Sequence, residues 1–376
     1  MDVTSEAFFR FSREIPGGVL CPNLEQLDWE IAIARTPPFF HIFLSPNLKR
    51  FRFCTYFVPE QPPQVAIELI SRLPSSLEHF LLRCNQSNRD GEPLKDTISS
   101  LVLRCGSLRS FGCRPPLSET ALRHLMQLPN LRSWVVFHEP PRTFSLSTFP
   151  PLEELHLEHA ALPWFHLLVA HGEERHRNRP APPPAIMNTD VKETLKVLTL
   201  PKGTTVDSVL LSSMSSFRNL VSVHVKNYDC PSNCLFNLTD NDVENFAATL
   251  PSLVDLRLGR VHQSAICRTT VSSLLSLSTH CLGLTSLEIH FGTYRIIRDM
   301  KLLLNKWSGR GKPRCKLRSL SVGSLLLPRA SNDECETLAM GFADIFPCLR
   351  DFVNHINVYT WKGVERRLRH RLTHGS

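Results

Sequence analysis

The chain has 376 residues, 42% of them hydrophobic, and a formal net charge of +8 at pH 7. This composition excludes a wholly disordered protein. The sequence contains no run of about 18 apolar residues, so no transmembrane helix is predicted, and residues 1–20 lack the features of a secretory signal. Twelve scattered cysteines, mostly within apolar runs, favour buried thiols in a reducing intracellular compartment, either cytoplasmic or nuclear.

A short strand pattern recurs along the chain. Each copy has a leucine anchor followed by an apolar residue at +3 and, in all but the last copy, another at +5, as in LPSLVDLRLG at residues 250–259; the last copy has Asn354 at +5. In chain order the anchors are Leu24, Leu48, Leu77, Leu108, Leu131, Leu152, Leu195, Leu220, Leu253, Leu284, Leu317 and Leu349. Their spacing is 21–33 residues, apart from one gap of 43. This period with an L-x-x-L-x-L core indicates a leucine-rich repeat.

Helical periodicity marks the segments between these strands. Such segments are 64–73, 95–105, 118–128, 239–250, 269–281 and 332–346, with capping starts expected at Ser118 and Asn332. We therefore expect an α/β leucine-rich-repeat solenoid, a curved strand–helix array of about twelve irregular repeats with its parallel strands on the concave face. Because +3 and +5 share one face of a strand, the repeat core is expected to include Leu24, Leu131, Leu152, Leu220, Leu253, Leu256, Leu258, Leu284, Leu287, Leu317 and Leu320.

Three segments depart from the repeat, which is assigned to residues 21–357. Residues 171–190 are charged and proline-rich, which predicts a flexible loop that either divides two sub-arrays or is an insertion in one repeat. Residues 1–20 are expected to cap the first repeat through Phe8, Phe9 and Phe11. Residues 358–376 are expected to form a capping helix and basic tail, whose outer face carries Arg366, Arg367, Arg369 and Arg371.

No motif of a catalytic or cofactor site occurs: phosphate-binding glycine loops, G-x-S-x-G and H-E-x-x-H are all missing. Cys230 and Cys234 approach metal-ligand spacing but lack a second pair, so two loop cysteines are the plainer interpretation. We expect no enzymatic activity, no cofactor and no metal. The basic run Lys306–Arg318 fits either a contact with a polyanion or a solvated connecting loop, and no recognised nucleic-acid module accompanies it.

Residues at +2 and +4 of each strand point away from the repeat core, and most of them are polar. Those expected to contact a partner are Arg50, Arg52, Glu154, His156, His224, Asp255, Arg257 and Glu288. Their alternating charges favour recognition of a protein over a lipid or a small apolar ligand. His156, His224 and His290 are interpreted as concave-face or structural residues rather than catalytic bases.

The segments TDNDVENFAATLPSLVDLRLG, STHCLGLTSLEIHF and RCKLRSLSVG resemble the repeat region of F-box proteins of the kind expanded in fungi. The resemblance runs from about residue 20 to 355 and is greatest over 236–354. It implies a non-catalytic array that holds a target protein for an SCF-type ubiquitin ligase. No membrane partner is expected. The alternative is a repeat scaffold without a ubiquitin role, regulatory or RNA-associated through its basic loop and tail.

The F-box of that family docks the adaptor subunit of the ligase and precedes the repeats. Here only about 20 residues precede the first repeat, which is too few for an F-box. Three explanations stay open: a fragment or misassigned gene start, a relative that lost its F-box, or recruitment through another surface. Ligase components are therefore expected as partners only if the F-box is supplied.

Overall fold

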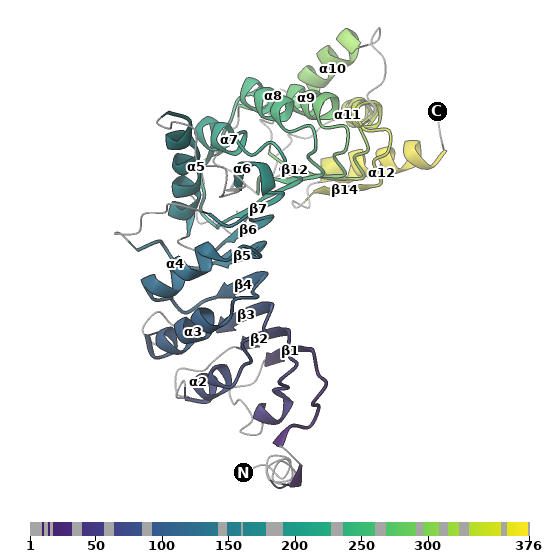
Figure 1. The fold of residues 1–376 in the computed structure, drawn as a ribbon. Helices are drawn as coiled ribbons and strands as arrows, with labels where there is room; N and C mark the ends of the chain where they lie inside the picture. Colours follow the sequence, from purple (N-terminus) through teal and green to yellow (C-terminus); the bar gives the residue numbers. More distant parts are fainter. Residues whose placement is uncertain are drawn as a thin grey trace. The chain divides into compact units, whose positions relative to one another are not determined.

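A computed structural model describes residues 10, 14–15, 18–31, 40–55, 64–84, 92–141, 149–158, 161–177, 191–226, 236–259, 268–290, 296–307, 315–322, 331–354 and 359–374. The chain divides into two compact units, Met1–Thr194 and Leu195–Ser376 (Figure 1). The boundary follows directly after the proline-rich insertion. Phe8, Phe9 and Phe11 of the predicted N-terminal cap lie outside the described residues.

The first unit is a ladder of parallel strands in chain order, β1 to β6, with helices on one of its two faces (Figure 1). Its elements are β1 (Gln26–Ile31), η2 (Phe40–Phe43), β2 (Arg50–Thr55), α2 (Gln64–Ser71), β3 (His79–Cys84), α3 (Glu92–Arg104), β4 (Ser110–Cys113), α4 (Glu119–Gln127), β5 (Ser133–Val136), β6 (Glu154–Leu157), α5 (Leu162–Arg177) and α6 (Val191–Thr194).

The second unit repeats this arrangement, with its strands in the order β7-β9-β11-β12-β13-β14. Its elements are β7 (Val197–Leu200), β8 (Val206–Asp207), α7 (Ser208–Met214), β9 (Ser222–Val225), β10 (Phe236–Asn237), α8 (Asp240–Thr249), β11 (Asp255–Arg257), α9 (Val271–His280), β12 (Ser286–Ile289), α10 (Ile296–Trp307), β13 (Ser319–Val322), α11 (Asn332–Ile345), β14 (Asp351–Asn354) and α12 (Tyr359–His374). Strands β8 and β10 pair separately with each other.

The repeat core follows the predicted spacing. Leu253, Leu256 and Leu258 are at most 1% exposed, and Leu256 lies in register with Val223 on one side and Leu287 on the other. Equivalent positions therefore stack from strand to strand, which confirms the predicted leucine-rich-repeat fold. Leu24 is the exception, since it is only half-buried. It belongs to the repeat of β1, which has a neighbouring strand on one side only.

Stacking of equivalent positions is most visible in a row of phenylalanines in the first unit. Phe51, Phe80 and Phe111 occupy +3 in consecutive repeats and are each 1% exposed. Their ring centroids are 6.0 and 5.6 Å apart, with nearly parallel planes. Parallel in-register pairing places these side chains one above the other, so one sequence position builds a continuous core through several repeats.

Helix starts are fixed by side-chain caps. Ser118 caps α4 as predicted, accepting a hydrogen bond from the Ala121 amide at 3.2 Å. Thr239 and Asp242 form a reciprocal capping box on α8. On α11 the cap is Ser331 rather than the predicted Asn332, because Ser331 pairs with Glu334 three residues on, at the spacing that a capping box requires.

Near the helix ends, buried cysteine thiols donate hydrogen bonds to backbone carbonyls of the preceding repeat. The Cys281 thiol donates to the Leu250 carbonyl of the preceding repeat at 3.5 Å, and Cys315 donates to Leu284 at 3.6 Å. Burial raises the pKa of Cys281 to about 12 and that of Cys105 to about 11. These thiols stay protonated and unreactive, as structural side chains do.

The segment predicted as a loop from residue 171 begins as helix. Helix α5 extends to Arg177, so the expectation is wrong for residues 171–177, while 178–190 lie outside the described residues. Pro163 is the second residue of the helix, where the first turn tolerates proline, and the helix buries Trp164, Phe165 and Leu168. The charged residues beyond them are good helix formers, so the helix continues past its apolar part.

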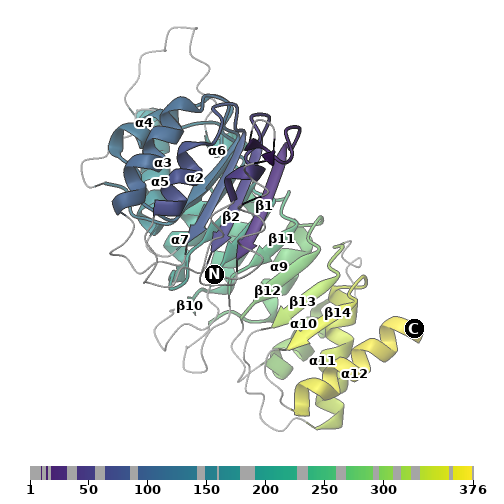
Figure 2. The ribbon, with the colours of Figure 1, turned by 90° about the horizontal axis from the view of Figure 1, so that it is seen from below.

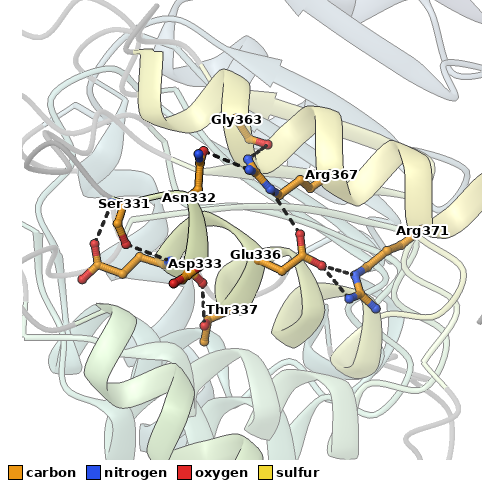
Figure 3. Close-up of polar contacts among 9 residues, drawn as sticks. Ser331, Asn332, Asp333, Glu336, Thr337, Gly363, Arg367 and Arg371 are labelled. Carbon is orange, nitrogen blue, oxygen red and sulfur yellow. Dashed lines mark hydrogen bonds and ion pairs between the residues drawn. The ribbon is translucent and has the colours of Figure 1, made fainter.

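Helix α12 is held on α11 by charged side chains (Figure 3). Glu336 of α11 accepts hydrogen bonds from Arg371 Nε at 2.8 Å and Nη2 at 2.5 Å, and pairs with Arg367 Nε at 3.2 Å. The predicted helix is present and buries Val364 and Leu368. However, Arg367 and Arg371 face α11 rather than lying on the outer face, because Glu336 offers them a carboxylate.

Candidate functional site

In each unit, the described helices cover one face of the strand ladder and not the other, and we call the second the open face. In the second unit the strand register aligns its polar residues into two rows across β9, β11, β12 and β13, of which β11, β12 and β13 lie side by side in Figure 2. The +2 row contains Ser222, Asp255, Ser286 and Ser319, and the +4 row contains His224, Arg257, Glu288 and Ser321. Residues far apart in the sequence thus form one continuous surface.

Asp255 is the centre of this surface. Its carboxylate lies 2.8 Å from Nε2 of His224 and accepts hydrogen bonds from Nε and Nη2 of Arg257, both at 3.1 Å. Burial alone would raise the pKa of Asp255, but the hydrogen bonds from His224 and Arg257 outweigh it and hold this pKa below its ordinary value. The cluster therefore presents an ionised carboxylate fixed between two donors.

Ser222, His224 and Asp255 resemble a catalytic triad in composition but not in geometry. The Ser222 hydroxyl is 3.1 Å from Nε2 of His224, and Asp255 contacts the same nitrogen. In a triad the two partners use opposite ring nitrogens, so that one nitrogen can take the serine proton. Here the nitrogen that donates to Asp255 cannot also accept from Ser222. The arrangement supports a binding surface rather than nucleophilic catalysis.

Two residues of β12 and its end are more deeply placed than their sequence positions suggested. Glu288 is 6% exposed, so it offers a partner far less surface than Arg257, its neighbour in the +4 row, whose side chain is 41% exposed. Its contact with a partner stays a prediction. His290 is 4% exposed, and burial lowers its pKa to about 4. His290 is therefore a neutral structural residue, one of the two interpretations left open for the histidines.

The first unit places its four candidate residues in two separate groups. Arg50 and Arg52 lie on β2, where Arg50 Nε is 3.8 Å from Asp28. Glu154 and His156 lie on β6 and are 3.8 Å apart. Between these groups the +4 row is apolar, consisting of Leu81, Gly112 and Val135. The structure therefore does not bring Arg50 and Arg52 together with Glu154 and His156.

One feature of the first unit was missed by sequence reasoning, a cavity of about 250 Å³ at the carboxyl ends of β4 and β5. Its lining includes Pro115, Pro116 and Pro141. The available signal was a pair of prolines shortly after each of these two strands, at 115–116 and 140–141. Each proline fixes its own φ angle, so the backbone is restricted at 115–116 and 140–141, next to the cavity.

The described ranges contain neither a cluster of metal ligands nor a membrane-spanning helix. Within those ranges no three His, Cys, Asp or Glu side chains come together as metal ligands. Among the same residues no helix is long and apolar enough to cross a bilayer. Cys230 and Cys234, and most of the basic run Lys306–Arg318, lie outside the described residues.

No protein-family model and no curated protein matches the chain. Among solved structures it is similar to the leucine-rich-repeat-containing protein LegL7 from Legionella pneumophila, with 10% identity over 97% of this chain and 94% of that one, at a TM-score of 0.32. It is also similar to the Rad7 and Elc1 complex in yeast, with 13% identity over 78% of this chain and 73% of that one, at a TM-score of 0.38.

Likenesses this distant carry no argument about function. The class of protein is defined by the chain's own strand ladders, register and leucine core, which are those of a leucine-rich-repeat protein.

Proposed function

We propose that this chain is a non-catalytic protein-interaction array whose open face binds a partner protein. The observation that carries the proposal is the Asp255 cluster, in which a carboxylate, an imidazole and a guanidinium from two adjacent repeats meet on the face that helices do not cover. Mixed, half-buried charges of this kind give specificity for a partner with complementary charges. Arg50, Arg52, Glu154 and His156 add outer contacts.

The sequence resemblance to F-box repeat regions supports a narrower proposal, that the partner is a target protein of an SCF-type ubiquitin ligase. The ligase link requires an adaptor-binding module in addition to the repeats. For the RNA-associated alternative, the C-terminal helix offers fewer basic side chains than expected, because Arg367 and Arg371 are engaged by Glu336, while Arg366 and Arg369 are exposed.

The test compares two double variants in affinity capture from cells in which the proteasome is inhibited. Asp255→Ala with Arg257→Ala removes one acid and one base from the open face. Glu244→Ala with Lys301→Ala removes the same charges from exposed positions on α8 and α10. We expect the first variant to lose a specific partner at least about tenfold, because truncating a half-buried charge pair at an interface costs several kcal/mol, and the second to retain it.

Equal recovery of every partner by both variants would contradict the open-face assignment. Cullin and adaptor subunits among the proteins recovered with the unaltered chain would support the ubiquitin role. A set of partners dominated by nucleic acid and lost as salt rises would instead favour the RNA-associated alternative.

A further inference from the structure

The cavity in the first unit lies between the loops that follow β4 and β5. Aromatic rings and prolines supply most of its wall, chiefly Phe111, Trp134, Phe137, Trp164, Pro115 and Pro141. Trp134 and Trp164 meet edge to face, with centroids 4.9 Å apart and an interplanar angle of 75°. Helix α5 contributes Trp164, so the wall combines strand, loop and helix residues.

Hydrogen bonds hold the described residues around the cavity, from Cys113 to Pro115 after β4 and at His138 after β5. The His138 ring contacts the Arg114 carbonyl through Nε2, which joins the loop after β5 to the loop after β4. Trp164 Nε1 donates to the His138 carbonyl at 2.8 Å, and the Cys113 thiol donates to the Pro115 carbonyl at 3.2 Å. The cavity is therefore shaped before any ligand arrives, and Trp164 and Cys113 turn their donors into the wall rather than into the cavity.

The size of the cavity restricts its ligand. At about 250 Å³ it is larger than the roughly 150 Å³ apolar cavity that holds a benzene ring. It is smaller than the range of about 300–1,000 Å³ that is usual for drug-sized ligands and cofactors. This volume suits a single ring system. Walls made of rings favour an aromatic ligand, because aromatic groups pack edge to face against one another.

The position of Val135 links this cavity to the open face. Val135 lines the cavity and also occupies the +4 position of β5, between Gly112 and His156 in the register. The exposed Glu139 lies at the same wall, so the cavity reaches the surface. Val135 and Glu139 thus place part of the cavity wall at the edge of the open face.

We propose that this cavity receives a single aromatic side chain, tryptophan or phenylalanine, from the protein that binds the open face. The inference rests on the proposed function, because it assumes a protein partner there. Buried aromatic anchors in preformed pockets commonly dominate protein interfaces. The apolar +4 residues of the first unit would then contact the aromatic part of the partner, while Arg52 and His156 at the two ends of that row contact its polar groups.

The experiment measures binding of small probes to the full chain by saturation-transfer NMR. N-acetyl-tryptophanamide carries the side chain with its backbone amides, free indole carries the ring alone, and N-acetyl-leucinamide is the aliphatic comparison. We expect the tryptophan amide to bind within about threefold of indole and at least about threefold more tightly than the leucine amide. Leu117→Trp, at the cavity wall, should reduce the signal at least about fivefold, while Leu103→Trp, on the exposed side of α3, leaves it unchanged.

Two outcomes overturn the proposal. The first is binding of indole without binding of the tryptophan amide, which indicates a closed small-molecule site. The second is an equal signal from Leu117→Trp and Leu103→Trp. If Leu117→Trp does not fold, photolabelling of the unaltered chain with a diazirine analogue of the tryptophan amide decides. Labelling at residues 113–117 or 134–141 supports the proposal, and labelling elsewhere overturns it. These probes bind without a partner protein, so this result can be interpreted even if the capture experiment fails. Likewise, a negative result with the probes does not affect the interpretation of the capture experiment.

Discussion

Replacing Leu256 with alanine is expected to lower the free energy of unfolding by about 2–5 kcal/mol. Leu256 is 0% exposed and lies in register between Val223 and Leu287, so the neighbouring strands prevent the site from collapsing around the lost methyl groups. Denaturant-induced unfolding followed by circular dichroism measures the change. Because the chain has two compact units, the transition of the second unit is fitted separately.

The matched control for this prediction is Arg257→Ala at the next residue of the same strand. The Arg257 side chain is 41% exposed, so losing its pair with Asp255 is expected to cost about 1 kcal/mol or less. If Arg257→Ala lowered the free energy of unfolding as much as Leu256→Ala, the outward face of the strand would be as important for packing as the inward face, which would contradict the assignment of that face to partner binding.

Gly341→Ala is expected to destabilise the protein by about 1–3 kcal/mol, although alanine is normally the better helix former by about 1 kcal/mol. Gly341 lies on α11 where Met300 of α10 packs against it, and a Cβ at this position would overlap the Met300 Sδ and lie 2.6 Å from Cγ. Met300 is fully buried and cannot swing away into solvent. Chemical denaturation measures the effect.

A double-mutant cycle isolates the cause of that effect. Met300→Ala alone is expected to cost about 2–5 kcal/mol through the cavity it leaves. In the double variant the new Cβ of residue 341 occupies part of this cavity. The double variant should therefore lose at least about 1 kcal/mol less unfolding free energy than the sum of the losses of the two single variants. Strict additivity would mean that Gly341 is required for a reason other than the close approach of α10.

The repeat was predictable because the same leucine spacing recurs and only stacking can bury it. The depth of individual side chains was less accessible to sequence reasoning. Glu288 has the alternation of an outward residue, yet its burial depends on what neighbouring repeats place beside it. Likewise, helical spacing identified α12 but could not show that Glu336, about 30 residues earlier, would turn Arg367 and Arg371 inward.

The candidate site was predictable only as a list of positions. Asp255 and Arg257 were expected on one face, and the strand register adds that His224 of the preceding repeat completes their cluster. The aromatic cavity was not predicted, because its wall joins strands, loops and a helix that no single periodicity connects. Helix α5, which supplies Trp164, was itself hidden by the charged composition of its second half.

The central claim is that the open face of the strands, and not the helical face, contacts a partner protein. Site-specific photo-cross-linking tests it most directly, with a benzophenone amino acid placed at Ser319 in the +2 row or at the exposed Arg298 on α10. We expect one partner polypeptide to be cross-linked in cells from residue 319 and not from residue 298. Cross-linking of the same partner from residue 298 alone would contradict the assignment of the open face.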